Sequence, residues 1–206
     1  PQPNNTTRRQ RQMCIRDSFK SLPESKPFLK FQDFYLQAED AGQPFTEAGC
    51  ISSVDQDGAP HARYVNFKYF FEDNLIFFSS YTSNKALDFD KNQKVAINFW
   101  WPSIDVQIRA EGIISKCPEK FSDEHFYGRE QGKNIAAIAS DQSKLIDSYE
   151  MLEDRYEHIK SSIESGELEE VRPENWGGYQ VKVTFFEFWE ANKDRPVSYT
   201  HLRAHE

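Results

Sequence analysis

Between residues 48 and 117 the chain is a series of short apolar and β-branched runs separated by turn residues. The runs span 48–54, 61–71, 75–80, 95–101 and 106–117, and turns such as Asp55-Gln-Asp-Gly58 and Glu72-Asp-Asn74 separate the first three. Short strands joined by Asp, Asn and Gly turns are typical of an antiparallel meander. A further meander is expected at 179–190, where the spacing of apolar residues indicates a change of register.

Segments with helical spacing of apolar residues lie before, between and after these strands. Phe28, Phe31, Phe34 and Tyr35 recur near helical spacing within residues 27–41. Residues 83–91 and two or three segments within 118–166 are also expected to be helical, the longest with an apolar seam that packs against the body or a partner chain. The pattern predicts a mainly β fold with peripheral helices, of the α+β class.

One folded domain is expected at residues 19–196. Residues 1–18 are polar and patternless, and residues 197–206 abandon the preceding strand rhythm, so both ends are interpreted as non-native or disordered segments. Both ends also resemble translated sequencing-adapter sequence.

The charge distribution argues against nucleic acid as a partner. The chain has a net charge of -8, and residues 1–18 hold four arginines against one aspartate, so the remainder is more acidic still. No apolar run approaches the roughly 20 residues that a membrane helix needs. We expect a cytoplasmic protein without a membrane partner.

Several catalytic classes lack their sequence signals. The three cysteines have no CxxC spacing, which argues against a zinc site or a disulfide framework. The chain also has no GxSxG elbow, no GxGxxG and no GxxxxGK motif. If the chain is an enzyme, a bound cofactor is expected to carry the chemistry.

Cations in the strand region indicate a site for an anionic, planar ligand. Arg63 and Lys68 lie on one short strand but on opposite faces. Ser79, Ser83 and Lys85 lie where a strand gives way to a helix, an arrangement that suits a phosphate. Alternatively, Ser83 only caps the helix and Lys85 is a solvated surface charge.

Two further clusters are candidates for ligand contacts. Gln107 and Arg109 face away from the apolar side of their strand, so Gln107 could pair with a heteroaromatic ring. His125, Arg129 and Lys133 recur every four residues and would share one helical face. They suit a second phosphate about as well as they suit a solvated helix face.

Five motifs in order resemble those of the pyridoxamine 5'-phosphate oxidase family. They are Arg63-x-Val-x-x-Lys68, Phe78-Ser-x-x-x-Ser-x-Lys85, Trp101-x5-Gln107-Ile-Arg109-x-x-Gly112, Gln142-Ser143 and Trp176-Gly-Gly-Tyr-x-Val-x5-Glu187-Phe-Trp189. The resemblance covers roughly residues 27–195. It implies an FMN-binding split β-barrel that forms a homodimer, with FMN at the subunit interface and a C-terminal dimerisation region at about 173–196.

The resemblance also implies the residues of the site. The implied cofactor-binding residues are Arg63, Tyr64, Val65, Lys68, Phe78, Ser79, Asn84, Lys85, Gln107, Gln142, Ser143 and Trp189. Of these, Gln142 and Ser143 are expected to come from the partner subunit. The implied substrate-binding residues are Lys68, His125, Arg129, Lys133 and Arg195, and Arg195 is also the implied catalytic residue.

The implied activity is oxidation of pyridoxamine or pyridoxine 5'-phosphate by O2 to pyridoxal 5'-phosphate and hydrogen peroxide, in vitamin B6 biosynthesis or salvage. The chain departs from the family at Asn84, His125 and Lys133, where arginine, tyrosine and serine are usual, and after Arg195, where the Arg-Leu-His-Asp-Arg run is missing. Two alternatives are a related FMN oxidase acting on another amine or a phenazine-type substrate, and a non-catalytic protein that binds flavin or pyridoxal phosphate.

Overall fold

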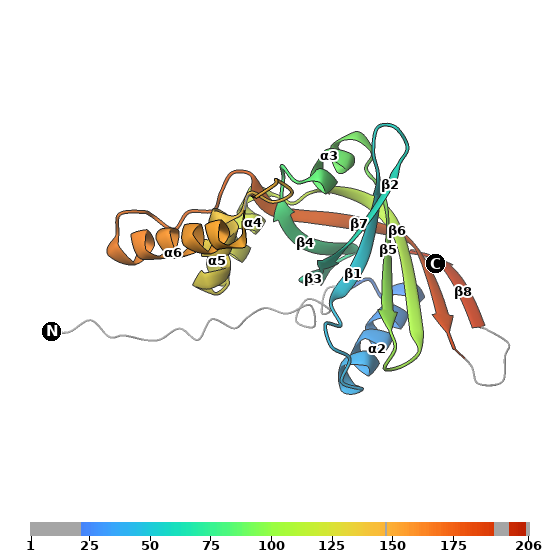
Figure 1. Cartoon of the computed structure of the whole chain (residues 1–206). Coiled ribbons are helices and arrows are strands. Elements are labelled where there is room, and N and C mark those ends of the chain that lie inside the picture. Colours follow the sequence, from blue (N-terminus) through green and yellow to red (C-terminus); the bar gives the residue numbers. More distant parts are fainter. Residues whose placement is uncertain (1–21, 147, 192–197, 205–206) are drawn as a thin grey trace.

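The computed structural model describes residues 22–146, 148–191 and 198–204 (Figure 1). The N-terminal segment 1–18 and Arg195 therefore lie outside the described residues. The strands are β1 (Ala48–Val54), β2 (Pro60–Asn66), β3 (Tyr69–Phe71), β4 (Asn74–Ser80), β5 (Lys94–Trp101), β6 (Val106–Lys116), β7 (Trp176–Glu190) and β8 (Ser198–Arg203). The helices are α2 (Lys26–Asp40), α3 (Asn84–Lys91), α4 (Glu119–Gly128), α5 (Gln131–Ala139) and α6 (Tyr149–Ser165).

The strands form one curled antiparallel sheet, which confirms the predicted fold class. The strand order is β2-β1-β5-β6-β7-β4-β3, so the two ends of the sheet are strands that follow each other in the chain. The single strand expected at 61–71 divides where the backbone changes partner. The amide of Phe67 donates to Glu47 O, whereas the amide of Lys68 donates to Ile76 O in β4. The chain thus passes from one edge of the sheet to the other and curls it into a half-barrel.

The predicted register change lies in β7, which is one strand of 15 residues rather than a meander. Val183 pairs with Gly112 and Phe185 pairs with Glu111, so Thr184 is an extra residue on β7. The buried positions accordingly shift from Val181 and Val183 to Phe186 and Phe188. The bulge lets one long strand keep an apolar face toward the core along its whole length.

Aromatic side chains fill the core between α2 and the sheet. Pro27 lies in the first turn of α2, where its missing amide donor costs nothing, and the helix ends shortly before Gly42 at φ 75°. Phe31 is fully buried and contacts the rings of Phe70 and Phe99 at centroid distances of 4.9 and 5.4 Å. The predicted helix at 27–41 is thus confirmed as the element that covers this side of the sheet (Figure 1).

The segment after residue 197 differs from the expectation. Residues 198–203 form β8, although a disordered tail was predicted. Along β7, strand β4 pairs with residues 176–182 and does not reach further. β8 pairs with residues 185–190, on the edge of β7 that β4 leaves open among the described strands. Unpaired strand edges favour the addition of a strand, and Ala204 is also buried against the core. The interpretation that these residues are non-native stays a prediction.

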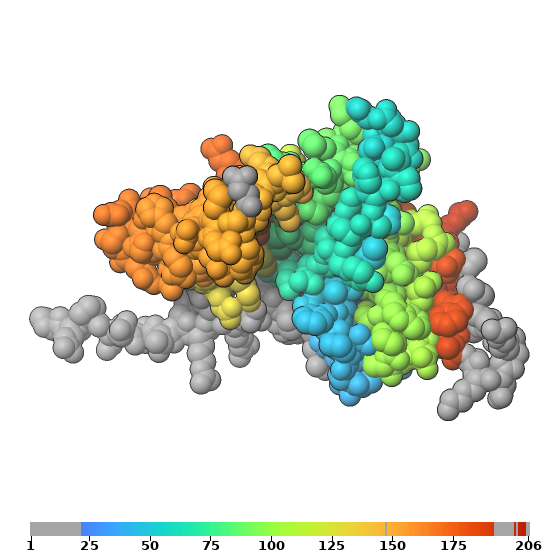
Figure 2. All heavy atoms as spheres, viewed as in Figure 1, coloured from blue at the N-terminus to red at the C-terminus, as the bar shows by residue number. Residues whose placement is uncertain are grey.

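Helices α4, α5 and α6 lie together beside the sheet and form a lobe, seen in orange and yellow in Figure 2. The apolar seam of α6 faces α5, but α6 has no fully buried residue. None of the described helices is long and apolar enough to cross a membrane.

Candidate functional site

The turn from β4 into α3 holds a buried cation. Lys85 is 8% exposed, and its Nζ donates to Ser79 Oγ at 2.9 Å and to Ser83 Oγ at 3.1 Å. No carboxylate among the described residues pairs with it. Burial, followed by the charge of Arg63, lowers the pKa of Lys85 to about 8. Lys85 is therefore not a solvated surface charge, and Ser83 Oγ donates to Ser80 O rather than capping α3.

Arg63 is held beside this lysine by a network on β1, β2 and α3. Its Nη1 donates to Ser53 Oγ at 2.7 Å, and its Nη2 lies 3.5 Å from Asp88 Oδ2. Asp88 also accepts from Ser53 at 2.5 Å and contacts His61 Nδ1 at 3.0 Å. Burial raises the pKa of Asp88, but these hydrogen bonds and the charges of His61 and Arg63 outweigh burial and hold the pKa below its usual range.

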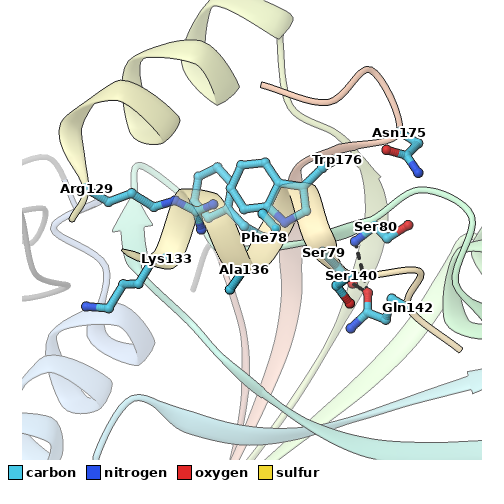
Figure 3. Close-up of a pocket in the computed structure, with 11 residues that line it drawn as sticks. Phe78, Ser79, Ser80, Arg129, Lys133, Ala136, Ser140, Gln142, Asn175 and Trp176 are labelled. Atoms are coloured by element: carbon cyan, nitrogen blue, oxygen red, sulfur yellow. Dashed lines mark hydrogen bonds between the residues drawn. The ribbon is translucent and has the colours of Figure 1, made fainter. Parts of the chain in front are cut away.

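Gln142 and Ser143 meet the same turn from the loop between α5 and α6. Gln142 Oε1 accepts from Ser79 Oγ at 2.8 Å and from the amide of Ser80 at 3.0 Å (Figure 3). The amide of Asn84 donates to Ser143 Oγ at 3.3 Å. These residues were expected from the partner subunit, but their short loop already reaches Ser79 and Asn84 within one chain.

A cavity of about 270 Å³ brings most of the predicted residues together. The lining residues are Tyr64, Val65, Asn66, Lys68, Phe78, Ser79, Lys85, His125, Arg129, Gln142 and Trp176. β2 and β4 supply one wall, and α4 and the start of β7 supply the other. The cavity thus has the Lys85 cluster on one side and Arg129 on the other.

Arg129 has a buried guanidinium nitrogen without a hydrogen-bond partner in the described part of the chain. Its Cζ lies 4.1 Å from the ring centroid of Trp176, and its Nε donates to Asn134 Oδ1. Its Nη2 is buried and makes no hydrogen bond to any described residue. Burial, partly opposed by Glu170, lowers the pKa of Arg129 to about 10, so the group remains a cation at neutral pH. Figure 3 shows the guanidinium beside the rings of Trp176 and Phe78.

The other predicted substrate-binding residues differ in how they face this cavity. Lys68 lines it, with Nζ 3.4 Å from Glu47 Oε1. His125 lines it as an uncharged ring, because burial, then the charges of Arg129 and Lys68, lower its pKa to about 3. Lys133 pairs with Glu130 at 3.0 Å and lines an adjoining pocket that Arg129 also lines (Figure 3). His125 lies on α4 and Lys133 on α5, so these residues do not share the face of one helix.

Gln107 and Trp189 lie far from the Lys85 cluster in the same chain. They pair with each other across β6 and β7, whereas Ser79 pairs with Gly177, twelve residues away along β7. That separation is roughly 40 Å of extended strand. Figure 1 shows β7 running from α4 across the sheet to β8.

The residues near Gln107 divide between the core and the surface. The Nη2 of Arg109 lies 2.9 Å from Glu187 Oε2, so the Arg109 guanidinium already forms an ion pair. Trp101 is buried and donates to Thr46 O at 3.1 Å. Trp100 is exposed and lies 6.1 Å from Trp189, between ring centroids.

Four residues that orient the site were not predicted as site residues. Asn134 holds Arg129, Asp88 holds Arg63, Tyr69 contacts His125, and Trp176 stacks on Arg129. Trp176 belongs to the Trp-Gly-Gly-Tyr motif and could have been found from it. The other three act through a neighbouring side chain, which spacing along the chain does not reveal.

The curled sheet is shared with two solved structures. PhzG from Burkholderia lata, solved with tetrahydrophenazine-1-carboxylic acid, matches with a TM-score of 0.77 at 21% identity, over 90% of this chain and 96% of PhzG. A pyridoxamine 5'-phosphate oxidase-related, FMN binding protein from Nostoc punctiforme matches with a TM-score of 0.63 at 13% identity, over 87% of this chain and 99% of that protein. The fold is therefore that of the split-barrel proteins.

Sequence comparison then gives the family. The profile described as pyridoxamine 5'-phosphate oxidase matches residues 41–162. A pyridoxine/pyridoxamine 5'-phosphate oxidase from Hydrogenovibrio crunogenus is 36% identical over 172 residues, which is 84% of this chain and 78% of the relative. The chain belongs to the pyridoxamine 5'-phosphate oxidase family, as the five motifs indicated.

Proposed function

We propose that this chain is an FMN-dependent oxidase that converts pyridoxamine or pyridoxine 5'-phosphate and O2 to pyridoxal 5'-phosphate and hydrogen peroxide. The observation that carries the proposal is the pair of cations on one cavity, Lys85 and Arg129. Within the described ranges, the hydrogen-bond partners of Lys85 are both hydroxyls, and Arg129 has a buried nitrogen without a partner. Two such groups suit two phosphates, one on the cofactor and one on the substrate.

The residues around Lys85 fit the phosphate of FMN. A buried ammonium without a carboxylate partner is costly unless an anion binds to it, and the pKa lowered to about 8 reflects that cost. Arg63 adds a second positive charge beside Lys85, and the N-terminus of α3 favours an anion at the same place. Bound FMN would supply the two-electron acceptor that passes its electrons to O2.

Arg129, Lys68 and His125 would hold the substrate phosphate at the other side of the cavity. Arg129 supplies the unpaired Nη2, Lys68 supplies a second charge, and His125 supplies a neutral ring. The rings of Phe78 and Trp176 are stacked, with centroids 5.4 Å apart, and form an apolar wall. This wall excludes water from the bound ring and fixes its plane, so the protein contributes placement. The catalytic role of Arg195 belongs to the same proposal and lies outside the described residues.

A homodimer with FMN at the interface is part of the proposal. Gln107 and Trp189 belong to the implied cofactor site, yet they lie twelve β7 residues from the pairing of Ser79 with Gly177. A second copy could bring its own Gln107 and Trp189 to the Lys85 cluster, with residues 173–196 contributing to the interface. We also place the enzyme in the cytoplasm.

The test is oxidation of four compounds by the FMN-loaded protein: pyridoxine and pyridoxamine 5'-phosphates, and the same two vitamers without phosphate. The proposal predicts pyridoxal 5'-phosphate and peroxide from the phosphorylated pair only. Turnover of the unphosphorylated pair or of a phenazine precursor would favour a related oxidase. FMN binding without any turnover would favour a non-catalytic binding protein.

Subunit mixing tests the shared site. At an FMN concentration that saturates only the wild type, Lys85→Met and Trp189→Ala should each have little activity, but mixed dimers would contain one site with neither substitution. About a quarter of the sites should then be intact after exchange in equal amounts. Mixing Lys85→Met with Ser79→Ala is the control, because both residues belong to the same half-site. No recovery in the first mixture, despite exchange of subunits, would contradict the shared site.

A further inference from the structure

Tyr69 and His125 form a pair in the wall of the cavity. Tyr69 is 5% exposed, and its Oη lies 2.7 Å from Nδ1 of His125. The two rings meet edge to face at 84°, with centroids 5.5 Å apart. On its other side His125 stacks on Phe78 at a centroid distance of 3.6 Å and an angle of 8°. These contacts fix both the position and the rotation of the imidazole ring.

The hydrogen bond between the two rings has a definite direction. A neutral imidazole has one donor and one acceptor nitrogen, and His125 is neutral because its pKa lies at about 3. Burial raises the pKa of Tyr69 to about 12, so the hydroxyl keeps its proton. Among the described residues, Nδ1 of His125 is the single hydrogen-bond partner of that hydroxyl. A buried hydroxyl proton needs an acceptor, so Tyr69 donates to Nδ1, and the imidazole proton resides on Nε2.

The Nε2 atom is free for a ligand. No hydrogen bond between described residues uses it, and His125 lines the same cavity as Lys68 and Arg129. Those two residues already supply the charges that a phosphate needs. A third cation in the same cavity would repel them, whereas a neutral N–H donor satisfies a phosphate oxygen without that cost.

We propose that Tyr69 is a positioning residue that holds His125 as its Nε2–H tautomer, so that His125 donates an uncharged hydrogen bond to the substrate phosphate. This inference rests on the proposed function for the identity of the ligand. It assigns to Tyr69 a role in phosphate recognition that Tyr69 performs through its neighbour, without touching the substrate.

The test uses Tyr69→Phe in the full chain loaded with FMN. The substitution keeps the ring and its contacts with Phe121 and His125 but removes the donor. Tyr179→Phe is the matched control, because its buried hydroxyl has no hydrogen-bond partner among the described residues. Long-range proton–nitrogen correlation spectra of the histidine ring report the tautomer directly, and steady-state kinetics with pyridoxine 5'-phosphate report KM and kcat.

The wild-type and control proteins should show protonated Nε2 and unprotonated Nδ1 at His125. Tyr69→Phe should shift the Nδ1 resonance, populate the Nδ1–H tautomer, and raise KM about three- to tenfold, as expected for weakening one charge-assisted hydrogen bond. The kcat should change less than about twofold, since the chemistry lies at the other end of the substrate.

A double-mutant cycle decides whether Tyr69 acts through His125. In a His125→Phe background, Tyr69→Phe should have no further effect on KM. A protonated Nδ1 in the wild type, an unchanged KM, or additive effects would each overturn the proposal. If the wild type lacked oxidase activity, the proposed function would fail separately, and the tautomer together with the Kd of pyridoxal 5'-phosphate would still decide the role of Tyr69.

Discussion

Replacing Lys85 with methionine should stabilise the FMN-free protein while it weakens FMN binding. Methionine keeps an unbranched stem of similar length and removes the buried charge. Both hydroxyls that contact Lys85 retain another partner, because Ser79 donates to Gln142 and Ser83 donates to Ser80 O. The substitution therefore leaves no new unsatisfied hydroxyl.

The stability gain follows from the pKa of Lys85. The fall from 10.5 to about 8 corresponds to about 3 kcal/mol that the folded FMN-free protein loses by keeping this lysine charged. After the loss of two hydrogen bonds, at about 1 kcal/mol each, we expect a net gain of about 1 kcal/mol, or about 3 °C in Tm. The charged lysine destabilises the fold below pH 8, and this effect disappears as pH rises from 8 to 10.5, so the gain should shrink over the same range.

The expected loss of FMN affinity is about 100-fold. Opposite charges in contact at a partly buried site contribute about 4 kcal/mol at most, and about 3 kcal/mol corresponds to 100-fold in Kd. Circular dichroism melts of the FMN-free protein measure Tm, and quenching of FMN fluorescence measures Kd. Lys91→Met, on the exposed end of the same helix, should change neither. A lower Tm, or an FMN affinity within threefold of wild type, would refute the reasoning.

Three other predictions concern the substrate phosphate, acid stability and the bulge. Arg129→Ala should raise KM for pyridoxine 5'-phosphate about 100-fold without changing the Kd of FMN, and a KM that stays the same would remove Arg129 from the substrate site. Because the pKa of His125 is lowered to about 3, the folded state loses stability as pH falls from 6.5 toward 3; His125→Phe should therefore flatten the dependence of Tm on pH in that window, and parallel curves would contradict this. Gly112→Ala should cost more than about 2 kcal/mol in urea unfolding, since its Cβ would meet Lys182 O, whereas Gly128→Ala has open space; equal stability of the two variants would be the contrary result.

The elements of the fold were predictable where the signal is local. The turns at 55–58 and 72–74 and the helical spacing at 27–41 each correspond to an observed element. The shift between Val183 and Phe186 revealed the bulge because side chains on a strand alternate. The break at Phe67 and Lys68 was missed, since it depends on which strands lie on either side of the chain. The pairing of β8 with β7 depends on how far β7 extends past the end of β4. The sequence of residues 198–203 does not carry that information.

The sequence predicted residues proposed to bind a ligand better than it predicted the residues that position them. Lys85 and Arg129 are cations within motifs that indicate phosphate binding. Asn134 and Tyr69 orient Arg129 and His125 through hydrogen bonds that exist only in the folded chain. Lys133 shares its helical spacing with Arg129, but its exposed position lets it pair with Glu130 instead. Spacing alone therefore cannot show which of these cations is buried and lacks a carboxylate partner and which already has one.

The most direct measurement of the central claim is the ratio of kcat/KM for pyridoxine 5'-phosphate to that for pyridoxine, with the protein saturated with FMN. Arg129 and Lys68 at the substrate phosphate predict a ratio of about 100 or more, since the absence of each charge-assisted hydrogen bond costs roughly 1.5–3 kcal/mol. Pyridoxal 5'-phosphate should form together with peroxide. A ratio near one, or no oxidation of either compound by the FMN-loaded protein, would contradict the account.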